Sequence, residues 1–181
     1  MRPSASGLVS DACGLVRDAS GLVRDASGLV RDASGLVSDS ETAEQYKDMA
    51  KRTRDICREV TRFSRYCRRF TDLARNEDPS GMLRDASGLV SDACSILRNA
   101  SGLVSDALGL VMPMNAEEKV KELSEKADTL EKKADDLEKQ TQYVTDPEEI
   151  SAIAKKASGL VRDASGLLRD TSGLVRNGPG L

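Results

Sequence analysis

The sequence predicts an all-α protein: an antiparallel helical bundle of coiled-coil type, with about five helices of roughly 30–35 residues each. Three observations support this fold class. A seven-residue unit, Ala-Ser-Gly-Leu-Val-Arg-Asp, recurs along the chain. A period of seven places its alanine and leucine on one side of a helix, and the two-residue alternation typical of a strand is absent. The segments between the repeats keep apolar residues at the same alternating spacings of three and four.

Three blocks of the repeat define three of the predicted helices. Copies begin at Ala5, Ala12, Ala19, Ala26 and Ala33, then at Pro79, Ala86, Ala93, Ala100 and Ala107, and finally at Ala157, Ala164 and Thr171. With alanine at heptad position a, leucine falls at d and valine at e, while serine, glycine, arginine and aspartate take b, c, f and g. We expect arginine and aspartate to face water. The predicted packing stripe consists of Leu8, Leu15, Leu22, Leu29, Leu36, Leu89, Leu103, Leu160, Leu167 and Leu174.

Capping residues and prolines set the helix boundaries. We predict helices at 5–38, 41–76, 80–112, 116–144 and 148–176, within one domain that spans residues 1–181. Residues 38–42 are rich in N-cap types and the heptad phase slips there. They therefore either break the first helix or form a stammer in a continuous helix of about 110 Å. Short connections between helices of similar length favour antiparallel neighbours.

Glycine at position c weakens each repeat helix. A glycine inside a helix costs roughly 1 kcal/mol relative to alanine. These helices are therefore expected to form only when their apolar stripe is buried against neighbours. The glycines either mark close contact between helices or are neutral residues of a duplicated unit.

Composition excludes several classes of function. The formal net charge is -3 and the chain has no histidine. The net charge disfavours nucleic-acid binding, and the lack of histidine removes the usual general base. No phosphate-binding glycine loop is present, so we predict a non-enzymatic protein without cofactor or metal. No window approaches the roughly 18 apolar residues of a membrane-spanning helix, and Asp11 interrupts what would be the apolar part of a signal peptide. We predict a cytoplasmic protein.

The cysteines, at positions 13, 57, 67 and 94, show no Cys-x-x-Cys spacing. We expect small, buried or half-buried thiols, with a disulfide or redox role as the alternative. A zinc site would need all four thiols, and their scatter disfavours it.

Residues 51–75 are strongly basic. The arginines at outer heptad positions are Arg54, Arg58, Arg62, Arg65, Arg68 and Arg69. One interpretation is a solvated surface, partly balanced by the Glu/Lys-rich segment at 117–139, where surface ion pairs such as Glu122–Lys126 are expected. The other is a binding face for an anionic partner: lipid headgroups, nucleic acid or an acidic protein.

Two functions fit these observations. The first is a structural, self-associating protein, a scaffold or assembly component whose partners are its own copies or other helical proteins. Near-identical heptads favour this function because the same register can recur along an assembly. The alternative is an amphipathic bundle that binds or inserts into anionic membranes.

Overall fold

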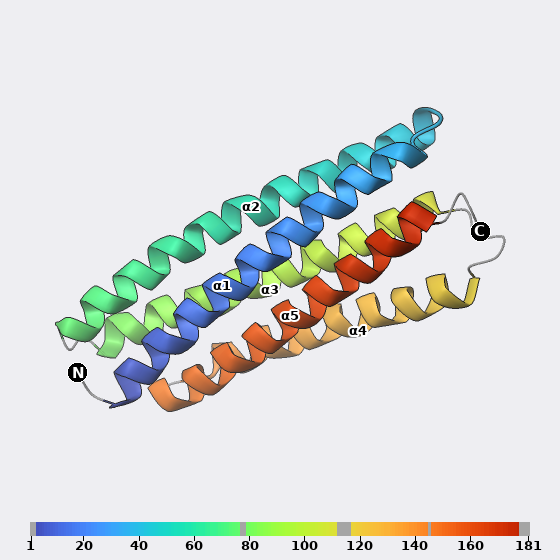
Figure 1. Ribbon diagram of the computed structural model, residues 1–181. Helices are drawn as coiled ribbons and strands as arrows, with labels where there is room; N and C mark the ends of the chain where they lie inside the picture. The colour runs from blue at the N-terminus through green and yellow to red at the C-terminus, as the bar shows by residue number, and fades with distance from the viewer. Residues whose placement is uncertain (1–2, 77–78, 112–116, 145, 178–181) are drawn as a thin grey trace.

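The structure, a computed structural model, describes residues 3–76, 79–111, 117–144 and 146–177, and these form a bundle of long helices (Figure 1). The helices are α1 (Pro3–Ala33), α2 (Ser40–Arg75), α3 (Pro79–Leu110), α4 (Glu117–Gln142) and α5 (Pro147–Asn177). The described residues contain no strand. The predicted all-α bundle is confirmed. Residues 112 and 116, where we placed two helix ends, lie outside the described residues.

The chain breaks between α1 and α2. A single 3-10 turn, Ser34–Leu36, follows α1, and Val37 is extended with φ -74° and ψ 116°. Asp39 then caps α2, because its carboxylate accepts hydrogen bonds from the Thr42 backbone N–H at 2.8 Å and from the Thr42 hydroxyl at 2.9 Å. These bonds lower the pKa of Asp39. The two segments are therefore separate helices, and the continuous helix is excluded.

Helix directions follow from the residues that pair across each interface. Arg52 pairs with Asp106 and Arg69 with Asp85, so α2 and α3 run in opposite directions. Between α1 and α5 the numbers rise together: the outermost hydrogen-bonded pairs are Asp11–Ser151 and Asp32–Ser172. Antiparallel packing thus holds between α2 and α3, which follow one another in the chain. The α1–α5 interface, the most extensive in the molecule, is parallel.

Three parallel helices, α1, α3 and α5, form the centre of the bundle. Helix α2 packs on α1 and α3, and α4 packs on α3 and α5, so these two lie on opposite sides of the central group (Figure 1). Two helices with so few neighbours keep one broad face in solvent. Their sequences fit this position, because α2 and α4 carry most of the charged residues outside the repeats.

The core is made of the apolar heptad positions. In α1, every repeat alanine and leucine from Leu8 to Ala33 is buried, and α4 buries Leu123, Ala127, Leu130, Ala134 and Leu137. Each fully buried leucine contributes roughly 1.5–3 kcal/mol of hydrophobic free energy. Within the predicted packing stripe, Leu36 and Leu160 are half-buried and the other leucines are buried. The apolar faces are therefore used inside one chain; among the described residues, Val37 and Tyr143 are the large hydrophobic side chains that remain exposed.

The glycines of α3 allow side chains of α2 to approach. A Cβ on Gly102 would collide with the guanidinium group of Arg52, and one on Gly88 would lie 2.9 Å from the hydroxyl oxygen of Tyr66. In α1, a Cβ at Gly14 or Gly21 would meet nothing within 4 Å. Close contact therefore accounts for some of the glycines, and others have no packing role.

A disulfide joins α1 to α2. Cys13 and Cys67 are bonded, with their Cα atoms 5.6 Å apart and a sequence separation of 54. Our prediction of unpaired thiols was wrong for these two residues. Cys13 replaces the repeat serine at position b of α1, where α2 packs, so the antiparallel pairing brings Cys67 beside it. Disulfides are typical of oxidising compartments, and the cytoplasmic location stays a prediction.

Candidate binding surfaces

The six arginines singled out in the basic segment all lie exposed on α2. Three of them form ion pairs. Arg62 binds Asp92 at 3.3 Å and Arg69 binds Asp85 at 3.1 Å, both on α3, while Arg58 lies 3.7 Å from Asp55 on its own helix. The pairs of Arg62 and Arg69 join the basic helix to the repeat aspartates of α3. Helix α4, which we expected to balance the arginines, packs on α3 and α5 instead.

The aspartates of α3 are not the water-facing residues that we predicted at heptad position g. Asp85 is buried, and Asp92 and Asp106 are half-buried. Burial raises the pKa of both Asp92 and Asp106, and the neighbouring Arg62 and Arg52 oppose that rise. Position g adjoins the leucine position on the helical wheel, so a neighbouring helix that packs on the leucines also covers the aspartates.

The remaining arginines of this face, Arg54, Arg65 and Arg68, form no ion pair with any described residue. At 100° per residue, the three lie within about 60° of one another around α2, so they form one line along the helix. We call them the free arginine line. Exposed, uncompensated guanidinium groups of this kind suit phosphate or carboxylate groups of a partner.

A ladder of polar contacts joins α1 to α5. The hydroxyls of Ser151, Ser158, Ser165 and Ser172 on α5 donate hydrogen bonds to Asp11, Asp18, Asp25 and Asp32 on α1. Every pair is separated by the same 140 residues. Ionised acceptors make such hydrogen bonds stronger than neutral ones. The ladder repeats once per heptad along the whole interface.

Arginines of α5 join three of the four steps of this Ser–Asp ladder. Arg162 lies 3.1 Å from Asp18, Arg169 lies 3.2 Å from Asp25, and Arg176 lies 3.7 Å from Asp32. A repeat serine and the arginine four residues later therefore hold the same aspartate. We did not predict this ladder, although the sequence contains its signal: each repeat unit has serine on one edge of its apolar stripe and aspartate on the other. Two such helices placed side by side in parallel offer a donor to each acceptor.

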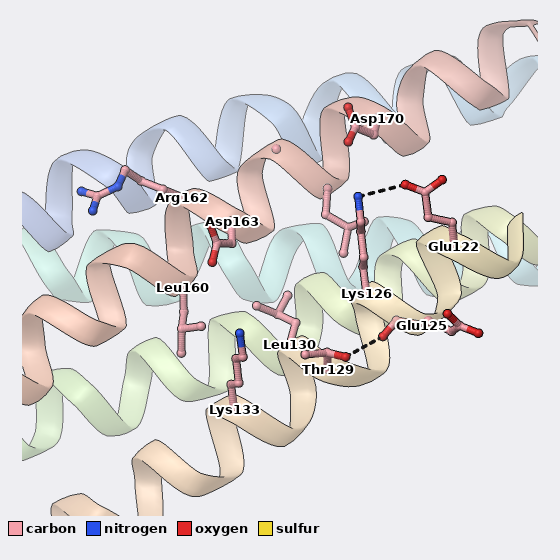
Figure 2. Close-up of a pocket in the computed structure, with 12 residues that line it drawn as sticks. Glu122, Glu125, Lys126, Thr129, Leu130, Lys133, Leu160, Arg162, Asp163 and Asp170 are labelled. Carbon is pink, nitrogen blue, oxygen red and sulfur yellow. Dashed lines mark hydrogen bonds and ion pairs between the residues drawn. The ribbon is translucent and has the colours of Figure 1, made fainter. Parts of the chain in front are cut away.

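A groove of about 610 Å³ separates α4 from α5 (Figure 2). Leu130 from α4 and Leu160 and Leu167 from α5 form its apolar lining. A second hollow of about 380 Å³ shares Leu160, Asp163 and Lys133 with the first, so the groove continues along the two helices.

Most of the charged side chains in this α4–α5 groove that form no ion pair with a described residue are acidic. Asp163 and Asp170 are exposed repeat aspartates of α5, and Glu125 lies on α4; none of them forms an ion pair with a described residue. Lys126 is already paired with Glu122 at 3.1 Å, a contact drawn in Figure 2. Lys133 is the one unpaired cation lining the larger hollow among the described residues. The groove therefore suits a helix with cationic and hydroxyl groups.

The two unbonded cysteines differ in accessibility. Cys57 is half-buried on α2 and Cys94 is buried in α3. Burial raises the pKa of the Cys94 thiol to about 12, so this thiol remains protonated and unreactive at neutral pH.

Within the described part of the chain, no group of three or more histidine, cysteine, aspartate or glutamate side chains is placed to hold a metal ion. No helix of that part is both long and apolar enough to cross a membrane. Comparison with protein-family models, curated proteins and solved structures found no match to this chain.

Proposed function

We propose that this protein is a structural, self-associating helical bundle that acts as a scaffold or assembly component. The observation that carries the proposal is the Ser–Asp ladder between α1 and α5, because it joins two copies of the same repeat to each other. A surface that pairs with its own repeat inside the chain has the chemistry to pair with the repeat of another chain.

The α4–α5 groove supports the same proposal. Asp163 and Asp170 have no ion-pair partner in the described chain, whereas the repeat aspartates of α1 and α3 are bound by neighbouring helices. Helix α5 therefore exposes repeat aspartates that have no arginine partner within the described chain. The apolar core is buried within the chain, and the aspartates of this edge are exposed, so association through the edge requires no unfolding of the bundle.

Light scattering at increasing protein concentration tests self-association. We expect the mean mass to rise with concentration and to fall again when salt is added, because the edges are charged and exposed. A constant monomer mass up to the highest attainable concentration would contradict the proposal.

The free arginine line favours a second function: binding to an anionic membrane surface. Arg54, Arg65 and Arg68 are exposed and without carboxylate partners, and each such cation near an anionic bilayer contributes about 1 kcal/mol. The Cys13–Cys67 disulfide holds α1 against α2, so this function uses headgroup contact and does not require the bundle to open.

Co-sedimentation with vesicles tests the membrane function. We expect binding to phosphatidylserine-containing vesicles and none to pure phosphatidylcholine. Replacing Arg54, Arg65 and Arg68 together by glutamate is expected to abolish it. A matched variant replaces three exposed lysines of α4, Lys121, Lys132 and Lys139, by glutamate, and it is expected to retain binding. Equal loss in both variants would show that net charge alone is responsible.

A further inference from the structure

The repeat has two different edges, and the α1–α5 interface uses only one from each helix. Helix α1 contributes its aspartate edge, and α5 contributes its serine and arginine edge. The complementary edges are the serines and arginines of α1 and the aspartates of α5, and these remain outside that interface. An exposed donor edge beside α2 and an exposed acceptor edge beside α4 therefore exist on the same molecule.

The free edge of α1 carries two complete donor steps. Ser20 and Ser27 are exposed, and so are Arg24 and Arg31, each four residues after its serine. Neither arginine forms an ion pair with a described residue. The hydroxyl of Ser20 donates to the backbone oxygen of Val16, a contact within its own helix that a better acceptor can replace.

The free edge of α5 carries two matching acceptor steps. Asp163 and Asp170 are seven residues apart, the same interval that separates Ser20 from Ser27. Both aspartates line the α4–α5 groove (Figure 2), and Leu160 and Leu167 belong to the same lining. The unpaired charges around them are predominantly negative and those of the α1 edge are positive, so the two edges are complementary.

We propose that the outer edge of α1 from one copy docks along the α4–α5 groove of a second copy and extends the Ser–Asp ladder between molecules. Ser20 and Arg24 bind Asp163 of the second copy, and Ser27 and Arg31 bind its Asp170. Each aspartate thereby receives the serine and arginine, four residues apart, that Asp18 receives from Ser158 and Arg162 within the chain. The inference rests on the proposed self-association and adds its contacts and polarity.

Such an interface is heterologous, because the edge and the groove are different surfaces. A pair of copies keeps one unused edge and one unused groove, so the assembly continues head to tail until it closes or the copies are exhausted. The helices of α1 and α5 run parallel in the intramolecular ladder and are expected to do so between molecules.

Two variants separate the edge from the groove. The groove variant reverses its charge with Asp163→Arg and Asp170→Arg, and the edge variant neutralises its charge with Arg24→Gln and Arg31→Gln, so the two altered surfaces do not attract each other. A matched control, Asp128→Arg with Glu131→Arg, reverses two exposed acids on α4 that lie outside the groove. Circular dichroism establishes that each variant is folded, and Asp163→Asn with Asp170→Asn replaces the groove variant if the reversal prevents folding.

Light scattering of the variants then gives distinguishable results. We expect species larger than dimers for the wild type and the control, and monomers for the groove and edge variants alone. An equimolar mixture of these two variants is expected to stop at a dimer, because the groove variant retains its edge and the edge variant retains its groove.

Each contrary result has a defined meaning. Association of the wild type and of both variants alike would overturn the proposed contacts while self-association stands. A mixture that remains monomeric, or that grows beyond a dimer, would overturn the head-to-tail polarity. A wild type that remains monomeric would overturn both this inference and the proposed function.

Discussion

Leu22 and Leu160 occupy the same position in identical repeat units, yet Leu22 is fully buried and Leu160 is half-buried beside the groove. Replacing Leu22 with alanine leaves a cavity between helices, so the free energy of unfolding should fall by about 2–5 kcal/mol. The change Leu160→Ala should cost clearly less, because groove water can fill the space. Urea unfolding followed by circular dichroism measures both, and equal losses would contradict the difference in packing.

Glu59 makes stability depend on pH. Burial, the largest cause, raises its pKa, and the hydrogen bond that Ser95 donates at 2.7 Å opposes the rise. The charged carboxylate is therefore disfavoured in the folded state. Its unfavourable effect is absent at a pH below the unfolded pKa and is complete above the folded pKa.

The variant Glu59→Gln removes this charge and retains an oxygen that accepts from Ser95. Its free energy of unfolding, relative to that of the wild type, should increase as the pH rises from about 4 to 7. Carboxylates that do not interact with Glu59 cancel in the comparison, and loss of the repulsion between Glu59 and Asp92 or Asp55 acts in the same direction as the burial. A difference that is constant with pH, or that decreases, would show that burial of Glu59 does not control its ionisation.

At the scale of helices, the Ser–Asp ladder should show measurable coupling. A double-mutant cycle with Ser165→Ala and Asp25→Ala, a pair that is hydrogen-bonded, should give a coupling free energy of about 1 kcal/mol or more. Ser27→Ala with Asp170→Ala changes the same residue types on the opposite edges, which do not meet within one chain. That cycle, measured under monomeric conditions, should give none; equal coupling in both would exclude a specific ladder.

The disulfide between α1 and α2 should account for much of the stability. Closing a segment of 54 residues removes unfolded-state entropy worth about 4 kcal/mol in the chain-entropy model. A reducing agent should therefore lower the denaturation midpoint of the wild type and of Cys57→Ser, and should have no effect on Cys67→Ser. A midpoint of the wild type that ignores reductant would contradict a bonded Cys13–Cys67 pair.

At the scale of the whole molecule, the break after α1 sets the particle length. The longest helix, α2, has 36 residues and is therefore about 54 Å long. Small-angle scattering extrapolated to zero concentration should give a maximum dimension somewhat above this value. A dimension near 110 Å would indicate that α1 and α2 are continuous in solution.

The helices and their buried sides were predictable because the period of seven is a local property of the sequence. The parallel α1–α5 interface was not, because loop length constrains consecutive helices and says nothing about helices 140 residues apart. The same limit applies to Cys13 and Cys67, whose proximity depends on how α2 packs. The six arginines were correctly placed on the surface, but the aspartates that bind Arg62 and Arg69 lie on α3, which composition could not identify.

Every step of the Ser–Asp ladder has the same separation in sequence, so more than one alignment of α1 and α5 can form it. Sliding one helix by seven residues, about 10 Å, would rebuild the same serine, aspartate and arginine contacts with one step fewer. The repeats therefore hold α1 and α5 together but do not fix the register between them. Residues outside the repeat must exclude the slipped isomers. The Cys13–Cys67 crosslink fixes α1 against α2, so its loss removes one constraint on the position of α1 and should favour misaligned forms during refolding.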